Sequence, residues 1–332
     1  MKSEALLHTH FPKTGKRLPW RSICSRETPI VEMAALANRA GMDSLYVKRD
    51  ELTNDTLGGS VIRKLEFVLA AAERKNKVNV ITHGSLGNDL SSALAFHAPP
   101  LGIKPQCIAH PQGTTTKHQR YLEDAIQHGL HVKRTRLPLE TALRAHLGRM
   151  NLWRKKVHYI PPGGGPHGAL GFVEAAFELA EQIQAEQCPQ PDTIFVPARS
   201  GATMAGLAVG LAILDLDITV VGVALQPRWQ TNLRRIRYLA DRTVALLRGA
   251  GCRKAVPPTP ERMVLLTDIA SSASGEPTQP TSAAISLARD AERLHLDPQG
   301  SGPVLTAILD QALTWNDFRR SKVLFWNTTA DR

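Results

Sequence analysis

The sequence predicts an α/β fold built from parallel sheets that are covered by helices. Short apolar runs alternate with longer helical patterns along most of the chain. The runs at 193–196 and 218–223 are almost continuously apolar, which is typical of strands buried on both faces. Gly-rich loops stand between several of these strands and the helices that follow. In such sheets ligands bind beyond the carboxyl ends of the strands, so these loops are the candidate functional regions.

The individual elements follow from the spacing of apolar residues. Between 62 and 74 apolar side chains recur three and four residues apart, which predicts a helix with one buried face. The strands expected by the same reasoning are 45–48, 78–81, 106–109, 193–196 and 218–223. The helices expected are 62–74, 90–97, 173–185 and 205–214.

Length and composition limit the class of protein. The 332 residues are 42% hydrophobic, enough for one large or two medium domains. No apolar run approaches the roughly 18 residues needed to cross a membrane, and the first residues lack a signal-peptide core, so we expect a cytoplasmic protein without membrane contact. The four cysteines form no CxxC pair and are expected to be reduced. The twelve histidines show no metal-binding spacing, so no metal site is predicted.

The chain is basic, with a formal net charge of +11 and a pI of about 9.7. The densest basic runs, 74–77, 154–156 and 234–235, are short and contain no aromatic residues. This pattern favours solvated helix faces over a nucleic-acid patch. Binding of nucleic acid is therefore an alternative that only the net charge supports, whereas a small anionic ligand suits a basic protein equally well.

The first functional loop is Gly58-Gly59-Ser60, where Ser60 is expected to cap the next helix. Upstream lies KRDELT (48–53), and downstream the helix continues as Arg63-Lys64-Leu65-Glu66. Together these segments resemble KRDDLT and GGNKxRKLE of the 1-aminocyclopropane-1-carboxylate deaminase/D-cysteine desulfhydrase group, within the fold-type-II (tryptophan synthase beta-like) pyridoxal-phosphate (PLP) family. In that family the lysine after GGN forms the Schiff base with PLP. Here Ser60 replaces the asparagine and Val61 replaces the lysine.

The resemblance extends from Thr28 to Thr328. It implies two open, twisted, mainly parallel-sheet domains with a cleft between them. The larger domain would comprise 1–60 and 161–332, on the side of the cofactor phosphate, and the smaller domain 61–160. It also implies a homodimer, PLP as cofactor, and deaminase or carbon–sulfur lyase chemistry.

Val61 conflicts with that chemistry. Covalent PLP catalysis needs an amine that holds the cofactor and moves protons at the substrate carbon, and a valine side chain can do neither. Lys64 lies three residues on, about one helical turn away, and is the candidate for a relocated lysine. The resemblance offers a simpler account, since active members of the family carry a second lysine at this position.

The second loop, 83–91, resembles a family G-S-N-H segment that opens a helix below the cofactor. Asn88 stands at the serine position, Asp89 at the asparagine position and Leu90 at the position of His or Gln. The family asparagine hydrogen-bonds the phenolic oxygen of PLP, where an aspartate would offer a negative acceptor instead of a donor. Asp89 is also expected to serve as the N-cap of the helix.

The third region has two parts, and the first, 161–172, resembles PPGGSSPxGTLGY. The second, 196–207, resembles a strand-GSGGTxAGL-helix element that binds the cofactor phosphate through backbone N–H groups and a threonine hydroxyl. The residues that match in its loop are Ser200, Gly201 and Thr203.

Two glycines of the family's phosphate loop are replaced, by Arg199 and Ala202. If either position needs a positive φ, the loop must change shape. Arg199 would then either add a positive charge to an anion site or fill it. We expect anion binding here, with a purely structural turn as the alternative.

The fourth region, 296–305, resembles LDPxYTGKA. Ser301 replaces the threonine near the pyridine nitrogen, and Gly300 replaces the tyrosine that is a candidate acid/base. The segments 275–278 and 323–328 also resemble family elements.

The positions that differ from the family are those expected to contact PLP, whereas the landmarks of the fold match. We therefore predict a pseudoenzyme that keeps the cleft for an anionic small molecule or a protein partner, with PLP bound non-covalently or not at all and no assigned catalytic residue. The alternatives are an active lyase that uses Lys64 and a PLP-independent enzyme in the same cleft. The residues predicted to line the cofactor side are Asn88, Asp89, Arg199, Ser200, Gly201, Ala202, Thr203 and Ser301.

Overall fold

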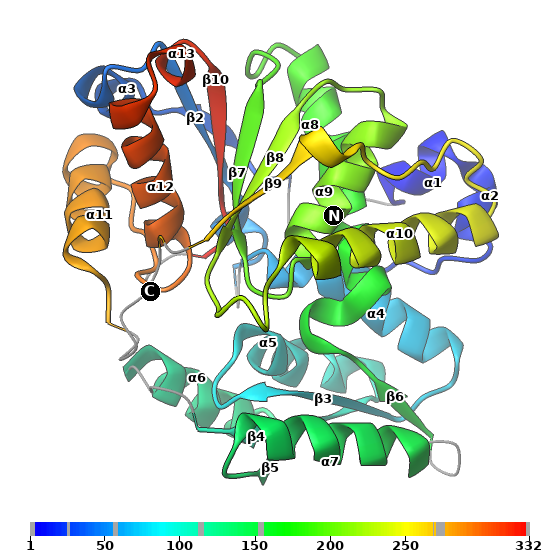
Figure 1. Cartoon of the computed structure of the whole chain (residues 1–332). Coiled ribbons are helices and arrows are strands. Elements are labelled where there is room, and N and C mark those ends of the chain that lie inside the picture. The colour runs from blue at the N-terminus through cyan, green and yellow to red at the C-terminus, as the bar shows by residue number, and fades with distance from the viewer. Residues whose placement is uncertain are drawn as a thin grey trace.

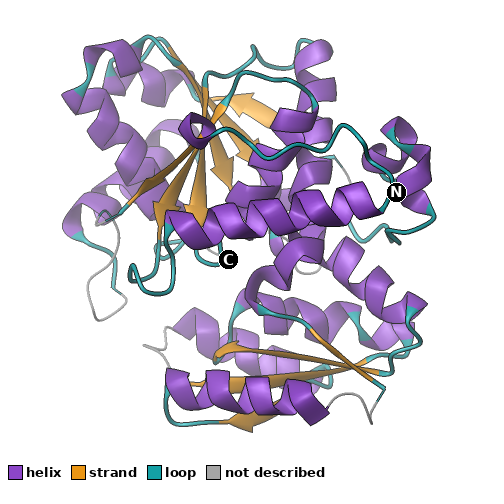
Figure 2. Ribbon diagram, turned by 45° about the vertical axis from the view of Figure 1, so that its right-hand side comes forward, coloured by secondary structure: helices purple, strands orange, loops and turns teal. Residues whose placement is uncertain are grey.

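Two mainly parallel sheets, each packed against helices, form the structure, which is a computed structural model (Figures 1 and 2). It describes residues 4–24, 27–55, 59–111, 116–151, 156–267, 269 and 276–329. Among the residues singled out above, Gly58, Arg154, Lys155 and Gly275 lie outside the described residues.

The larger unit is built on a six-stranded sheet in the order β1-β2-β10-β7-β8-β9. All neighbouring strands run parallel except the pair β1 and β2. The strands are β1 (Ile30–Glu32), β2 (Ser44–Arg49), β7 (Thr193–Ala198), β8 (Thr219–Ala224), β9 (Met263–Leu266) and β10 (Lys322–Asn327).

Helices cover this sheet on both faces (Figure 1). One apolar cluster joins Leu324 and Trp326 to α8 (Gly165–Gln184), α9 (Ala202–Ile213) and α10 (Leu233–Gly249). The other joins Val323 and Phe325 to α3 (Ala34–Ala40), α11 (Gln279–Glu292) and α12 (Ser301–Thr314). Because alternate residues of β10 enter opposite clusters, the strand is buried on both faces.

The smaller unit has a four-stranded parallel sheet in the order β5-β4-β3-β6. Its strands are β3 (Asn79–Ser85), β4 (Lys104–His110), β5 (His131–Arg134) and β6 (Val157–Tyr159). The helices α4 (Val61–Arg74), α5 (Asp89–His97) and α6 (Thr116–Gln127) contribute to the unit, and α7 (Pro138–Asn151) packs on the other face of the sheet.

Short elements complete the described chain. They are α1 (Leu6–His10), α2 (Pro12–Gly15), α13 (Asn316–Arg319) and the 3-10 turns η1 (Asp50–Leu52), η2 (Pro99–Leu101), η4 (Pro162–Gly164) and η5 (Pro260–Arg262). All strands of the four-stranded sheet lie between residues 61 and 160, and all strands of the six-stranded sheet lie outside this range. We therefore propose domain boundaries at these two positions.

The predicted strands and helices are confirmed, with one helix longer than expected. Helix α8 begins at Gly165 instead of 173, although this first stretch contains glycines that disfavour helices. A Cβ atom at Gly171 would lie 2.1 Å from the carbonyl oxygen of Arg63, so glycine is needed where α8 crosses α4. Close packing between the two helices overrides the local propensity.

Three further observations concern composition. The four cysteines are free, in agreement with the sequence. No helix in the described part of the chain is long and apolar enough to span a membrane. Among the same residues, no group of three or more His, Cys, Asp or Glu side chains is arranged to hold a metal ion.

Candidate functional site

The matching segments KRDELT and RKLE meet in a buried ion cluster, which we define as Lys48, Asp50, Arg63 and Glu178. Arg63 donates to Asp50 at 2.8 Å and to Glu178 at 2.7 Å, and Lys48 donates to Glu178 at 2.7 Å. All four side chains are at most 3% exposed. Trp326 also donates its indole N–H to Asp50 at 2.7 Å. The cluster therefore ties α4 to α8, β2 and β10.

Charge balance explains how this cluster is tolerated. Burial alone would lower the pKa of Arg63, but the carboxylates of Asp50 and Glu178 raise it well above its ordinary value. Burial lowers the pKa of Lys48, and Glu178 opposes that effect. Two cations and two anions thus compensate one another in a buried region. These motif residues are fully engaged in holding the fold and are not available to a ligand.

Glu66, the last residue of the same motif, anchors the N-terminal segment. Its carboxylate accepts hydrogen bonds from the backbone N–H groups of Ile23 at 2.9 Å and Cys24 at 3.0 Å, and from the indole of Trp20 at 3.2 Å. The family-like motif thus has a structural role at four of its positions, Lys48, Asp50, Arg63 and Glu66.

Val61 lies in the apolar core of the smaller unit. It is the first residue of α4, it is 8% exposed, and it belongs to the same cluster as Leu90. Ser60 is the N-cap residue, but its side chain makes no capping hydrogen bond, so the predicted cap is wrong. The backbone N–H of Ser60 instead donates to the carbonyl of Thr328 at 3.0 Å. The end of β10, not a side chain, anchors the start of this helix.

Lys64 occupies a different environment from its neighbour Arg63. Its stem lies against Gly168, where an added Cβ would be 3.6 Å away, and its ammonium lies 5.4 Å from the centre of the Phe172 ring. Burial lowers the pKa of Lys64 to about 8; Asp89 opposes this effect and Arg199 adds to it. Charges from both units therefore act on Lys64.

The loop before α5 corrects one expectation about capping. Asn88, not Asp89, is the N-cap residue, and its side-chain oxygen accepts from the backbone N–H of Ser91 at 3.0 Å. The amide nitrogen of Asn88 donates to the carbonyl of Ser85 at 2.7 Å. Asp89 is the first residue of the helix, where a negative charge is favourable at the positive end of the helix dipole.

The loop 199–203, which we call the anion loop, keeps its shape despite two missing glycines. Only Gly201 has a positive φ there, at 78°, and neither Arg199 nor Ala202 needs one. A Cβ at Gly201 would also lie 2.5 Å from Ile236. Ala202 begins α9, so the replacements at 199 and 202 leave the backbone N–H groups at the helix N-terminus in place.

Contacts link the anion loop to two other loops. Arg199 is exposed and donates to the backbone carbonyl of Gln299 at 2.7 Å, which joins it to the loop before α12. A Cβ at Gly163 would lie 2.0 Å from the hydroxyl oxygen of Ser200, so η4 packs tightly against this loop. Arg199 therefore lies at the surface of the loop.

The start of α12 leaves no room for the family's tyrosine. A Cβ at Gly300 would lie 2.7 Å from the hydroxyl oxygen of Thr329 and 3.0 Å from a carboxylate oxygen of Asp297. Ser301 is fully buried and donates to the backbone carbonyl of Thr329 at 3.1 Å. The segment after β10 thus occupies the space beside Gly300.

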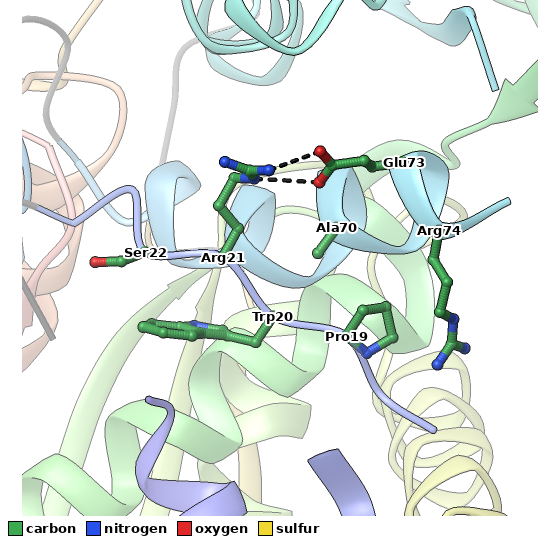
Figure 3. Close-up of a pocket in the computed structure, with 7 residues that line it drawn as sticks. All are labelled: Pro19, Trp20, Arg21, Ser22, Ala70, Glu73 and Arg74. Atoms are coloured by element: carbon green, nitrogen blue, oxygen red, sulfur yellow. Dashed lines mark hydrogen bonds and ion pairs between the residues drawn. The ribbon is translucent and has the colours of Figure 1, made fainter. Parts of the chain in front are cut away.

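A surface hollow of about 420 Å³ is lined by none of the residues predicted for the cofactor side. Figure 3 shows it between the segment around Trp20 and the C-terminal half of α4. Arg21 donates to Glu73 from two nitrogens, at 2.6 and 3.2 Å, across its rim. The hollow is a separate surface feature and not the predicted site.

The comparisons with known proteins agree with the fold and the motifs. Residues 22–328 match the family described as pyridoxal-phosphate dependent enzyme. A protein of Pyrococcus abyssi, provisionally named as a 1-aminocyclopropane-1-carboxylate deaminase, is 30% identical over 315 residues, which cover 94% of this chain and 89% of the relative. The D-cysteine desulfhydrase of Salmonella paratyphi B is 28% identical and covers 89% of this chain and 88% of its own.

The structural comparison leads to the same group. The crystal structure of an ACC deaminase homologue superposes with a TM-score of 0.79 at 26% identity, covering 99% of this chain and 95% of that one. The serine racemase of Dictyostelium discoideum shares the fold, with a TM-score of 0.65 at 17% identity over 97% of each chain. The chain belongs to the pyridoxal-phosphate-dependent enzyme family, in its fold-type-II branch, as a homologue of the deaminase/desulfhydrase group.

Proposed function

We propose that this protein is a non-catalytic member of its family that binds a small anionic ligand between its two units. The observation that carries the proposal is Val61, an apolar residue buried in the core at the position where the family holds its cofactor-binding lysine. An aliphatic side chain has no lone pair with which to bond a carbonyl carbon or move a proton. Gly300 supports this view, because the space beside it is closed to a tyrosine.

The anion loop supports binding. The backbone N–H groups at the start of a helix attract anions, and the 12-residue helix α9 begins at Ala202 directly after the turn at Gly201. Ser200 and Thr203 add hydroxyl groups beside this turn. Lys64 and Arg199 bring positive charge that acts on the same region. Asp89 and Asp50 oppose this charge, but Asp50 is already paired with Arg63.

The residues present fit PLP at one end only. The anion loop, with Ser200, Gly201 and Thr203, would hold the phosphate. When bound through a lysine, PLP withdraws electrons from the substrate carbon. Val61 cannot provide this attachment, and the amide of Asn88 is already engaged by Ser85 and Ser91. A phosphate or carboxylate ligand bound without a covalent bond is the ligand class that these residues suit.

Two measurements test this proposal. We expect isothermal titration with inorganic phosphate and with PLP to give saturable binding that Lys64→Met weakens, while the matched control Lys104→Met, at an exposed position on β4, binds as the wild type does. Borohydride reduction followed by peptide mass analysis is expected to find no lysine peptide that carries PLP. A PLP-modified lysine would overturn the non-catalytic assignment, and absence of binding by both ligands would overturn the anion site.

Lys64 supports a second candidate, an active carbon–nitrogen or carbon–sulfur lyase. A lysine with a pKa near 8 has a substantial neutral fraction at slightly alkaline pH, as a nucleophile or base requires. In this case aminocyclopropane carboxylate and water would yield a 2-oxo acid and ammonia, D-cysteine and water would yield a 2-oxo acid, ammonia and hydrogen sulfide, and Lys64→Ala would abolish the reaction. If Lys64→Ala retains full activity, Lys64 is not the base.

A further inference from the structure

Helix α7 carries its leucines on the outside of the smaller unit. Leu139, Leu143 and Leu147 are 79%, 56% and 54% exposed, and Leu137, just before the helix, is 63% exposed. Residues four apart lie on one side of a helix, so the three leucines of α7 form a continuous stripe. In Figures 1 and 2 this helix lies on the side of the small sheet that faces away from the larger unit.

The side of α7 that faces the sheet is polar or small instead. Thr141 and Ala145 are the buried positions among its described side chains. The hydroxyl of Thr141 hydrogen-bonds to the ring nitrogen Nδ1 of His110 at 3.1 Å and to the hydroxyl of Thr135 at 2.5 Å. These contacts fix the rotation of the helix. A helix normally buries its apolar side, so this reversed arrangement leaves an apolar surface that needs a cover.

We propose that a second copy of this chain covers the leucine stripe, with α7 packing against α7 of the other copy. The stripe is symmetric about Leu143, with one leucine a turn before it and one a turn after. A twofold axis through this point would bring Leu143 opposite Leu143 and Leu139 beside Leu147. Rows of residues four apart are the ridges that interlock when two helices pack.

The charges beside the stripe favour self-association here over other exposed surfaces. Glu140 pairs with Arg144 at 2.8 Å, so the flank of the stripe carries both signs. The exposed side of α10 also shows large side chains, such as Tyr238 at 65% exposure, but Arg234 and Arg235 are exposed beside it. Two copies that met there would bring like charges together, which opposes association. At α7 the ion pair of Glu140 with Arg144 offsets part of the positive charge, so repulsion is weaker.

The length of α7 limits how strong the proposed self-association can be. A helix of 14 residues is about 21 Å long, and one helix pair buries less than the roughly 800 Å² per partner of a standard stable interface. The contact should therefore be weak and depend on protein concentration. It could act alone or add a second contact to a dimer formed elsewhere.

Sedimentation velocity over a wide range of protein concentrations tests this contact. We expect Leu143→Glu to weaken the self-association step at least about tenfold, since two carboxylates would be forced together in an apolar contact. Leu313→Glu, at a 74% exposed leucine of α12, is the matched control and should associate as the wild type does. A wild type that shows no association step at any concentration, or a Leu143→Glu variant that associates normally, would overturn the proposal.

Thermal unfolding tests whether Leu143 belongs to the chain's own core, and cross-linking tests whether α7 itself forms the contact. Leu143→Glu should keep the wild-type melting temperature; a clear loss would mean that Leu143 belongs to the chain's own core and would also overturn the proposal. Leu143→Cys should give a covalent dimer with a short bismaleimide, because the twofold axis places this residue opposite itself, and Leu313→Cys should not. Failure of Leu143→Cys to cross-link above the Leu313→Cys background would count against the α7 contact even if the protein dimerises through another surface.

Discussion

Arg63 and Lys64 are neighbours in the sequence, yet they belong to two regions with different roles. Arg63 points into the buried ion cluster, where Asp50 and Glu178 neutralise it. Lys64 lies beside Gly168 and the ring of Phe172, and its ammonium is influenced by the charges of Asp89 and Arg199. The family-like motif therefore contains a structural part, and a second part to which we assign the proposed ligand site. A change in the first region should cost stability, and a change in the second should cost binding.

The largest effect is expected from Arg63→Ala. Removal of the guanidinium leaves the carboxylates of Asp50 and Glu178 buried with insufficient positive charge, so the free energy of unfolding should fall by about 3–5 kcal/mol. Lys64→Ala is the control and should lose less than about 1 kcal/mol, because it removes a charge that burial already disfavours. Urea unfolding measures both. Equal losses would show that the two residues do not belong to different regions.

Gly201→Ala should have the next largest effect, because it places a Cβ at a positive φ and 2.5 Å from Ile236. We expect a loss of about 2–4 kcal/mol, of which the backbone conformation contributes about 1–2 kcal/mol. Gly41→Ala isolates that backbone part, since Gly41 also has a positive φ but has no atom within 4 Å of an added Cβ. Phosphate binding should weaken only in the Gly201 variant. Identical losses in the two variants would contradict the tight packing at the anion loop.

The pH dependence of anion binding should report on Lys64. Its pKa of about 8 lies below the usual value for lysine, so its ammonium is charged below pH 8 and neutral above it. Phosphate affinity should therefore fall on the order of tenfold as the pH rises through 8, since one cation is lost from the site. Calorimetry at constant ionic strength measures this, and Lys64→Met should remove the step. A step that persists in the variant would assign the titration to another group.

The smallest effect is expected from Asn88→Ala. Loss of the cap that accepts from Ser91 should cost about 1 kcal/mol. Asn88→Asp can keep this bond but loses the donor to Ser85, so its stability should lie between those of the wild type and the alanine variant. Chemical denaturation measures the difference. If the alanine variant has wild-type stability but loses phosphate binding, Asn88 contacts the ligand and belongs to the second region instead.

The sequence by itself determined five of the strands, four of the helices, the family and the absence of a lysine at 61. Periodicity located the strands and helices because hydrophobic spacing is a local property, and the ordered motifs indicated the group to which the comparisons also lead. Two predictions made from the local sequence were wrong. The helix cap was assigned to Asp89 instead of Asn88. The first part of α8 was missed because a glycine-rich stretch rarely forms a helix.

Only the tertiary structure decided which motif residues are buried in structural contacts. Asp50, Arg63, Glu178 and Trp326 come from separate segments, and nothing in their spacing predicts that they meet. The same holds for the closed space at Gly300, which depends on Thr329, and for the outward leucines of α7, whose rotation depends on His110 and Thr135. In each case the physical reason is the same: the partner that fixes the side chain is distant in sequence, so its effect exists only once the chain has folded.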